Sequence, residues 1–195
     1  MAKGKILKGQ GVFIDRLCET VIDVEARPLP ASFFSKPAAI VARALIGATL
    51  VRMLEGRRFD YTVTETEAYE GDHDLACHSA KGRTARTEVM FGPAGRYYVY
   101  RIYGLHWMLN VVAGDVGEGA AVLIRGVEGI SGPGRVAAAL RLDGSFTGRD
   151  AIAANGLWFE QPAPQRRLRI KRTPRAGVDY AGPIWASKKL RFVKD

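Results

Sequence analysis

The sequence predicts an α+β fold, a single domain with a curved, mainly antiparallel β-sheet flanked by helices. Segments with strand-like patterns outnumber helical ones, and short glycine-containing turns join several of them. A chain of 195 residues is long enough for one domain with a real hydrophobic core. Residues 1–32 show no clean periodicity and start with basic residues, so we expect a flexible tail before a domain at residues 33–195.

A helix and a hairpin are the first predicted elements. Ser35 is a plausible N-cap, Pro37 suits the first helical turn, and Gly47 can end the helix. The sequence "ATLVRML" (48–54) predicts a strand that turns at "EG" and returns over residues 57–69. The buried face of the helix would contain Ile40, Val41, Ala44 and Leu45.

Strands dominate the rest of the chain. Residues 71–95 read as a long polar loop, which in a small domain is usually functional or disordered. An aromatic strand follows at 96–104, and two apolar strands at 105–114 and 120–129 are joined by the turn "DVGEG". A helix is expected over 131–142, beginning near Pro133. Short strands are expected at 156–160, 166–172 and 189–193.

The strand at 57–69 combines apolar side chains and carboxylates on one face. Alternate residues run from Phe59 through Val63 to Glu65, Glu67 and Tyr69. A carboxylate that faces inward is costly unless it is hydrogen-bonded, paired or used in chemistry. Either both glutamates lie at a solvated strand end with salt bridges, or one pairs structurally with an arginine and the other is a reactive base.

Composition limits the class of protein. The net charge of +9 favours an anionic partner, most commonly nucleic acid, although a merely soluble basic protein would share it. The sequence contains no apolar run long enough for a membrane span, and its start lacks the features of a secretory signal. Cys18 and Cys77 are too few for a disulfide framework, which favours a reducing cytosolic setting.

The segment "DHDLACH" (72–78) suggests zinc, because it supplies His73, Asp74, Cys77 and His78. Zinc needs three or four ligands in a defined geometry. Elsewhere the sequence offers only Cys18 and His106 as further Cys or His ligands, so we expect no metal. A histidine that forms hydrogen bonds in a pocket is the better interpretation.

The aromatic segment 97–107 holds a further set of candidates. Aromatic residues that alternate along a strand are most often packing residues. Tyr103 differs because it directly precedes Gly104, where the strand pattern breaks, so it could be exposed and stack on a base or insert into a duplex. Asn110, inside "WMLNVV", must satisfy a buried amide by capping backbone or by contacting a ligand. Arg125, at the end of "AAVLI", could pair with a buried carboxylate.

Several ordered motifs together resemble a known family. They include "KPAAIVARALIGATLVR", "TETEAYEG" with "DLACHS", "YYVYRIYGLHWMLNV", "AAVLIRGVE", "SGPGRVAAAL" and "AGVDYAGPIWASKKLRF". This set is similar to the alkyladenine (3-methyladenine) DNA glycosylases of the mammalian type, which also occur in bacteria. The resemblance covers residues 33–195, whereas residues 1–32 match nothing. The loop after His78 is shorter than in the mammalian proteins, and "LHW" (105–107) also differs, so the range of lesions is left open.

The resemblance implies roles for individual residues. Glu67 matches the general base that activates the attacking water, and Arg125 matches an arginine that helps to hold this water. A backbone carbonyl near Ala176 would be a further ligand of the water. The remaining matches form the base pocket: Tyr69 and Tyr100 sandwich the extruded base, His78 adds stacking and a hydrogen bond, Asn110 excludes the exocyclic amino group of normal guanine, and Tyr103 fills the gap in the duplex.

These matches imply a monofunctional DNA glycosylase that acts on alkylated or deaminated purines in double-stranded DNA. No lysine stands out as a nucleophile, and neither a metal nor another cofactor is required. We expect a monomer in the bacterial cytoplasm, associated with the nucleoid and not with a membrane. Two alternatives are a glycoside hydrolase that uses Glu65 and Glu67, and a nucleic-acid-binding module without activity. Glu65 has no assigned role, and a structural partner is the default.

Overall fold

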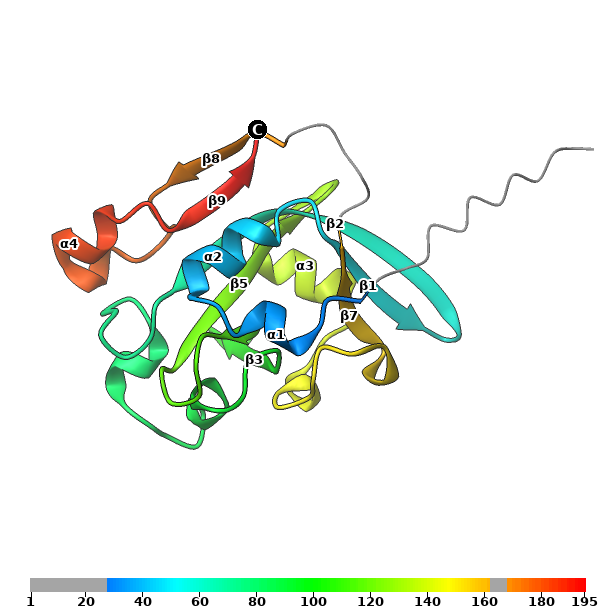
Figure 1. Ribbon diagram of the computed structural model, residues 1–195, viewed down its shortest axis with the longest axis horizontal. Helices are drawn as coiled ribbons and strands as arrows, with labels where there is room; N and C mark the ends of the chain where they lie inside the picture. Colours follow the sequence, from blue (N-terminus) through cyan, green and yellow to red (C-terminus); the bar gives the residue numbers. More distant parts are fainter. Residues whose placement is uncertain (1–27, 162–167) are drawn as a thin grey trace, which may run out of the picture.

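The computed structural model describes residues 28–161 and 168–195 (Figure 1). Nine strands form one sheet in this part of the chain, with the order β3-β4-β5-β2-β1-β7, and every strand pair is antiparallel. In addition, β6 pairs with β5, and β9 pairs with both β2 and β8. The predicted α+β class is therefore confirmed. The strands are β1 (Thr49–Leu54), β2 (Arg57–Tyr69), β3 (Tyr97–Ile102), β4 (His106–Ala113), β5 (Ala120–Val127), β6 (Ile130–Ser131), β7 (Leu157–Glu160), β8 (Ile170–Thr173) and β9 (Arg191–Lys194).

Short helices complete the fold. They are α1 (Ala31–Phe34), α2 (Ala38–Ala44), α3 (Pro133–Ala139) and α4 (Gly182–Ser187). The helix predicted from Pro133 is α3, and its N-terminal proline lacks only an N–H that a first turn leaves unpaired anyway. No helix in the described part of the chain has both the length and the apolar character that crossing a bilayer requires.

Helix α2 corrects two details of the sequence analysis. Its N-cap is Pro37 rather than Ser35, and no side chain caps its first turn. Ile40 is 54% exposed and Ala44 is also exposed, so the predicted apolar face is wrong at these two positions. The buried positions are Ala38, Val41, Ala42 and Leu45, which follow the i, i+3, i+4, i+7 spacing of one helical face.

The predicted strands are present, with bounds that differ by a few residues. The long loop at 71–95 contains two 3₁₀ turns, η1 (His78–Lys81) and η2 (Glu88–Phe91). Of the strand predicted at 166–172, residues 166 and 167 lie outside the described residues, as do Cys18 and residues 1–27 of the predicted tail. Residues 28–32 belong to the folded domain, because Pro28 pairs with Glu160 and the N–H of Leu29 donates to Phe159.

The two faces of the sheet have different surroundings. On β5, Ala120, Val122 and Ile124 belong to the main hydrophobic core, which also contains residues of α2 and α3. The alternate residues Ala121 and Leu123 turn to the opposite face, where a smaller cluster gathers around Tyr98 and Met90. This second face is where the cavity described below forms.

An irregularity in β2 decides which side chains reach that second face. Val63 pairs with Val127, Glu65 with Gly126 and Thr66 with Ile124, so the register skips Thr64 on β2 and Arg125 on β5. Val63 and Ala68 both lie in the main core although they have opposite parity along the strand. The predicted common face for Val63, Glu65 and Glu67 is therefore wrong, because an unpaired residue in a strand reverses the faces beyond it.

Candidate active site

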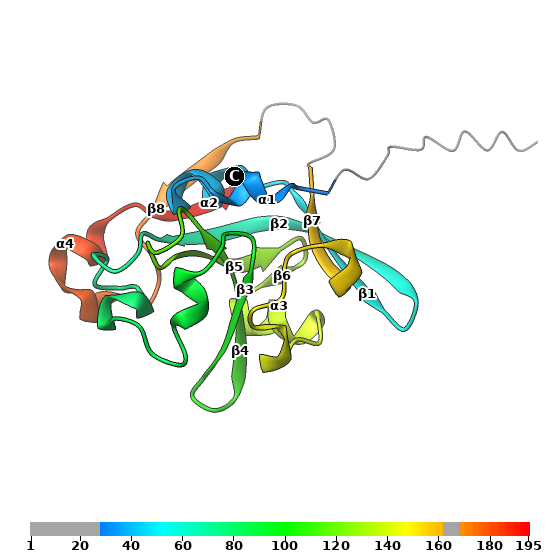
Figure 2. The same ribbon diagram turned by 60° about the horizontal axis from the view of Figure 1, so that its bottom comes forward.

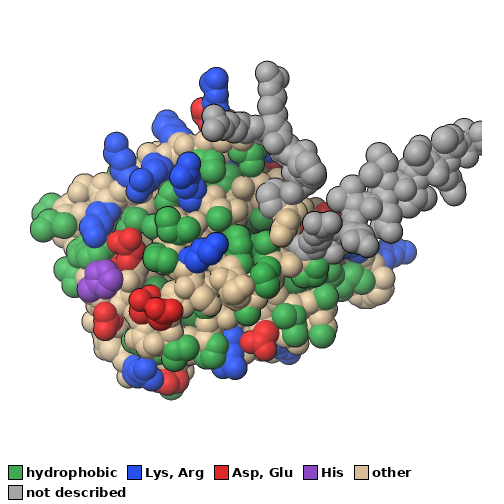
Figure 3. All heavy atoms as spheres, viewed as in Figure 1, with side chains coloured by type: hydrophobic (Ala, Val, Ile, Leu, Met, Phe, Trp, Pro, Cys, Tyr) green, Lys and Arg blue, Asp and Glu red, His purple; other side chains and the backbone are tan. Residues whose placement is uncertain are grey.

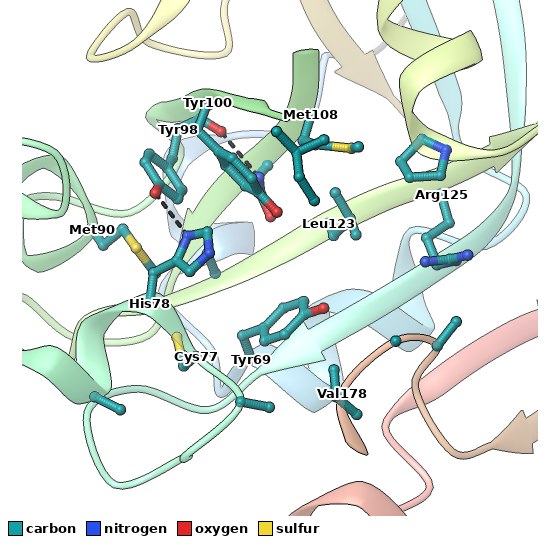
Figure 4. A pocket seen from close by; sticks show the side chains of 18 of the residues that line it. Tyr69, Cys77, His78, Met90, Tyr98, Tyr100, Met108, Leu123, Arg125 and Val178 are labelled. Atoms are coloured by element: carbon teal, nitrogen blue, oxygen red, sulfur yellow. Dashed lines mark hydrogen bonds between the residues drawn. The ribbon is translucent and has the colours of Figure 1, made fainter. Parts of the chain in front are cut away.

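A cavity of about 430 Å³ opens on the second face of the sheet. Its volume lies in the range of pockets that hold one small ligand. Figure 4 shows Tyr69 on one side of the space, Tyr98 and Tyr100 on the other, and His78 and Arg125 at its two ends. The lining includes most of the residues predicted for the site, namely Tyr69, His78, Tyr100, Tyr103, Asn110, Arg125 and Ala176.

Glu67 is the one predicted site residue that does not line the cavity. Its side chain is fully buried directly beside Tyr69. The hydroxyl of Tyr69 donates to Oε2 at 3.0 Å, and the backbone N–H of Ala176 donates to Oε1 at 2.8 Å. Nη1 of Arg125 lies 3.5 Å from Oε1. Three donors from three segments therefore fix the carboxylate at the edge of the cavity.

Opposing effects act on the ionisation of Glu67. Burial raises the pKa of its carboxyl above the ordinary value, while Arg125 and the hydrogen bonds from Ala176 and Tyr69 oppose the rise. Burial, together with the nearby Glu67 charge, also raises the pKa of Tyr69 well above its ordinary value, so this hydroxyl remains a donor. A buried carboxylate with a raised pKa can accept a proton more readily than a solvated one.

Glu65 binds the arginine that faces Glu67. Its Oε1 accepts a hydrogen bond from Nε of Arg125 at 2.9 Å and another from Nε of Arg191 on β9. The irregular register places Arg125 between the two carboxylates, since β5 skips this residue when it pairs with β2. Glu65 is thus a structural partner of arginines, and the two glutamates are matched by two guanidinium groups.

A second buried ion pair, between Asp74 and Arg175, holds two loops against the end of β2. Both side chains are fully buried, and Nη2 of Arg175 donates to Oδ1 of Asp74 at 2.9 Å while Nη1 donates to Oδ2. Nη1 also donates to the carbonyl of Ala68 at 2.9 Å, and the guanidinium lies 4.7 Å from the centre of the Tyr69 ring. The carboxylate in turn accepts from the N–H of Ala76. This pair fixes the loops on both sides of Tyr69.

Sequence reasoning missed Arg175 and considered Asp74 only as a metal ligand. The other members of that segment are separate: Cys77 accepts a hydrogen bond from Ser79, and His73 is largely exposed near Trp185. Within residues 28–161 and 168–195, no three His, Cys, Asp or Glu side chains come close enough together to hold a metal ion. The buried Asp74 required a cation, but nothing in the sequence indicated which arginine would supply it.

His78, Tyr98 and Tyr100 form an aromatic cluster at one end of the cavity. Nδ1 of His78 lies 2.9 Å from the hydroxyl of Tyr98, and its ring meets Tyr100 edge-on at 4.6 Å. Tyr98 and Tyr100 stack at 5.2 Å. Burial, with a smaller contribution from the positive charges of Arg86 and Lys81, lowers the pKa of His78 to about 4, so its ring is neutral at pH 7. Tyr98 and Arg86 were not predicted as site residues.

Asn110 lies on β4 directly opposite Tyr98, and of its two predicted alternatives the structure shows the bond to backbone. Its side chain is 3% exposed, and Nδ2 donates to the carbonyl of Tyr98 at 3.1 Å. It also lines the cavity. One bond to the backbone therefore holds the amide in a fixed orientation at the cavity wall.

Tyr103 lies at the tip of the β3–β4 hairpin, which projects from the body of the protein in Figure 2. Tyr103 and Gly104 both have positive φ angles, of 52° and 67°, as a tight hairpin turn requires. The side chain of Tyr103 is 86% exposed and still contributes to the cavity lining. The predicted exposure of Tyr103 is confirmed, and the residue stands at the rim of the cavity.

Comparisons with known proteins agree with the motifs. A model of the methylpurine-DNA glycosylase (MPG) family matches residues 32–131 and 129–195. A relative from Myxococcus xanthus (strain DK1622) is 48% identical over 177 residues, which cover 86% of this chain and 90% of the relative. A relative from Legionella pneumophila (strain Corby) is 43% identical over 177 residues, covering 87% of this chain and 96% of the relative.

A third relative, from Methanocella arvoryzae (strain DSM 22066 / NBRC 105507 / MRE50), is 42% identical over 175 residues, which cover 79% of this chain and 86% of the relative. All three relatives carry a name that assigns them, provisionally, as 3-methyladenine DNA glycosylases. The resemblance noted from the sequence motifs is confirmed. The chain belongs to the methylpurine-DNA glycosylase family.

Proposed function

We propose that this protein is a monofunctional DNA glycosylase in base excision repair, which extrudes a damaged purine from duplex DNA and hydrolyses its N-glycosidic bond. The observation that carries the proposal is the position of Glu67. Its carboxylate is buried, is held by Arg125, Tyr69 and Ala176, and lies directly beside a cavity with aromatic walls. Family membership supports the same class of reaction.

The cavity would hold the extruded base. A base within a duplex cannot expose its glycosidic bond, so an enzyme of this class has to flip it out at a cost of a few kcal/mol. Tyr69, Tyr100 and His78 line the space that would receive it, and stacking on aromatic side chains returns ~1–3 kcal/mol per base. Asn110, fixed by its bond to Tyr98, would exclude a normal guanine by contact with its amino group.

The exposed Tyr103 would fill the gap that the extruded base leaves in the duplex. An inserted side chain compensates for part of the lost stacking.

The surface also carries positive charge: in Figure 3, Lys and Arg side chains gather over β8 and β9, where Lys171 and Arg172 are exposed. Such charge favours binding to the phosphate backbone. The proposed partner is double-stranded DNA, bound by a monomer without a cofactor.

The proposed chemistry follows from the surroundings of Glu67. As the glycosidic bond breaks, the sugar develops positive charge, as in sugar hydrolysis. Glu67 would stabilise that charge and accept a proton from a water molecule, whose oxygen bonds to the sugar carbon while the bonding electrons leave with the base. Arg125, fixed by Glu65, would help to hold the water, as would a backbone carbonyl near Ala176. The products are a free base and an abasic site, without strand cleavage.

The proposed substrates are alkylated or deaminated purines: 3-methyladenine, 7-methylguanine, ethenoadenine and hypoxanthine. The names of the relatives support the first of these. We place the glycosylase domain at residues 33–195, to which the contacts of Pro28 and Leu29 add residues 28–32, and the protein in the bacterial cytoplasm with the nucleoid. A carbohydrate hydrolase with Glu65 and Glu67 as its acid pair is disfavoured, because both carboxylates contact the same guanidinium of Arg125.

The test uses duplexes that each contain one hypoxanthine, ethenoadenine or 7-methylguanine. Each is incubated with the wild type or with Glu67→Gln, and abasic sites are then cleaved with alkali. We expect strand breaks only with the wild type and only after alkali. Breaks without alkali would show a lyase step and contradict the monofunctional mechanism. Equal breaks with both proteins would exclude Glu67 as the base. No excision of these three lesions, together with no release of 3-methyladenine from methylated duplex DNA, would reject the proposed function.

A further inference from the structure

The lining of the cavity carries positive charge. Among the described residues that line it, Lys81 and Arg125 are the only Lys, Arg, Asp or Glu side chains. The buried Glu67 lies beside the cavity but contributes no exposed surface. A base in the cavity would therefore meet cationic and neutral groups at its walls.

Most arginines near the cavity are matched by a carboxylate. Arg125 contacts Glu65 and Glu67, Arg191 contacts Glu65, and Arg175 is paired with Asp74. Arg86 and Lys81 differ, since neither takes part in any ion pair within residues 28–161 and 168–195. These two residues supply the unmatched positive charge at this end of the site.

Arg86 is placed directly on the aromatic cluster. Its Nε donates to the hydroxyl of Tyr98 at 3.2 Å, and its guanidinium carbon lies 4.9 Å from the centre of the Tyr100 ring. Arg86 is exposed and does not line the cavity, so it contacts Tyr100 from outside the cavity. A cation on an aromatic ring is attracted by the negative face of that ring. The same ring then attracts a second cation less, and the two like charges also repel each other.

The pKa of His78 is affected by the same two positive charges. His78 begins the 3₁₀ turn η1 that ends at Lys81, its Nδ1 lies 2.9 Å from the hydroxyl of Tyr98, and its ring contacts Tyr100. Its pKa falls to about 4, mainly through burial and further through Arg86 and Lys81. Burial accounts for most of this lowered pKa, and the part that Arg86 and Lys81 add has the direction in which their charges would act on a cationic base.

We propose that Arg86 determines lesion preference, favouring neutral purine lesions, such as hypoxanthine and ethenoadenine, over cationic N-alkylated purines. This inference rests on the proposed glycosylase function. Arg86 acts through Tyr100 and Tyr98, which line the cavity, and does not touch the reacting atoms itself. It is therefore a specificity-determining residue and not a catalytic one.

The test compares Arg86→Gln with a matched control, Arg83→Gln. Arg83 belongs to the same loop, is exposed, and lies 4.7 Å from the ring of Phe91, which does not line the cavity. Both substitutions remove one formal positive charge, and Arg83 differs from Arg86 in that it forms an ion pair with Glu88 at 3.2 Å. Single-turnover excision rates are measured with saturating protein on one duplex with 7-methylguanine and one with hypoxanthine. Saturation removes differences in DNA affinity, and the spontaneous loss of 7-methylguanine is subtracted.

We expect the ratio of 7-methylguanine to hypoxanthine excision to rise about two- to fivefold in Arg86→Gln, the range that one exposed cation–π contact supplies. Arg86→Glu should raise it further, and Arg83→Gln should leave it at the wild-type value. An unchanged ratio in Arg86→Gln, or an equal rise in Arg83→Gln, would overturn the role of Arg86 while leaving the glycosylase function intact. Failure of the wild type to excise either base would instead reject both bases as substrates of the proposed function, and this inference with them.

Discussion

Arg175 and Asp74 form a bidentate ion pair in which both side chains are fully buried. The residue after Arg175 is Ala176, whose N–H donates to Glu67, and the residues after Asp74 lead to His78. One ion pair therefore joins the two loops that supply neighbouring parts of the cavity wall, where Ala76 packs with Val178. Removing this ion pair should therefore lower the stability of the fold, because the pair holds the loops and does not touch the reacting atoms.

Asp74→Asn should lower the free energy of unfolding by roughly 3–5 kcal/mol, because it leaves the Arg175 charge buried without a partner. Urea unfolding at pH 7 measures this change. The control is Glu55→Gln, which removes an exposed pair with Arg141 and should cost less than ~1 kcal/mol. Equal urea midpoints for Asp74→Asn and the wild type would show that the pair does not hold the loops.

The neighbouring residues Tyr97 and Tyr98 should separate stability from activity. Tyr98→Phe removes the hydroxyl that contacts His78 and Arg86, so excision should slow by roughly fivefold or more, since each bond contributes ~0.5–1.5 kcal/mol. Tyr97→Phe removes a bond to Leu157 in the main core, so it should lower stability by ~1 kcal/mol and leave the excision rate unchanged. Excision rates and urea midpoints are measured for both. A larger loss of activity in Tyr97→Phe would contradict the assignment of the two faces.

Tyr103→Ala should reduce excision from duplex DNA by about tenfold to a hundredfold, because nothing then offsets a few kcal/mol of unstacking. The side chain is 86% exposed, so its loss should leave the thermal midpoint nearly unchanged. The same lesion in single-stranded DNA is the internal control, since no gap forms there. Equal losses on both substrates would show that Tyr103 acts elsewhere in the reaction.

His78 should make the protein less stable in mild acid. Its pKa in the folded state is lowered to about 4, from an ordinary value of 6.5. The stabilisation from neutral His78 is therefore complete above pH 6.5 and is lost as the pH falls towards 4, because the unfolded chain binds the proton first. In His78→Gln, the decline in urea midpoint between these values should be smaller than in the wild type. His106→Gln, at an exposed position, is the control and should keep the wild-type decline.

Much of the fold could be predicted because its strands carry local signals. The alternating aromatic residues of β3 and the glycine after Tyr103 identify a strand and a tight turn without any tertiary information. The exposure of Ile40 could not be predicted in the same way, because an exposed isoleucine and a buried one give the same local pattern of apolar residues. Only packing against β2 and β5 selects Val41 and Ala42 for the core.

The residues of the candidate site, like the elements of the fold, could be predicted only in part from the sequence. Residues of the motifs, such as Glu67, Tyr69 and Arg125, could be placed in one site before the structure was known, and they do lie together. Arg86 and Arg175 could not be singled out, since their importance depends on contacts with Tyr100 and Asp74 across the fold. The sequence contains 29 Lys and Arg residues, and local pattern does not distinguish the buried or stacked ones from the rest.

The skipped residue Thr64 in β2 has a consequence for how the protein can change in evolution or by design. With the present spacing, Val63, Thr66 and Ala68 face the core side, whereas Glu67 and Tyr69 face the cavity. Pairing Thr64 with β5 in a regular ladder would leave every amino acid of the site intact and still turn Glu67 and Tyr69 to the core side, whereas deleting Thr64 would keep the present faces. The side on which Glu67 lies thus depends on this one irregular pairing as well as on the residues of the motif, and a single residue inserted directly after Thr66 would turn Glu67 and Tyr69 away from the cavity.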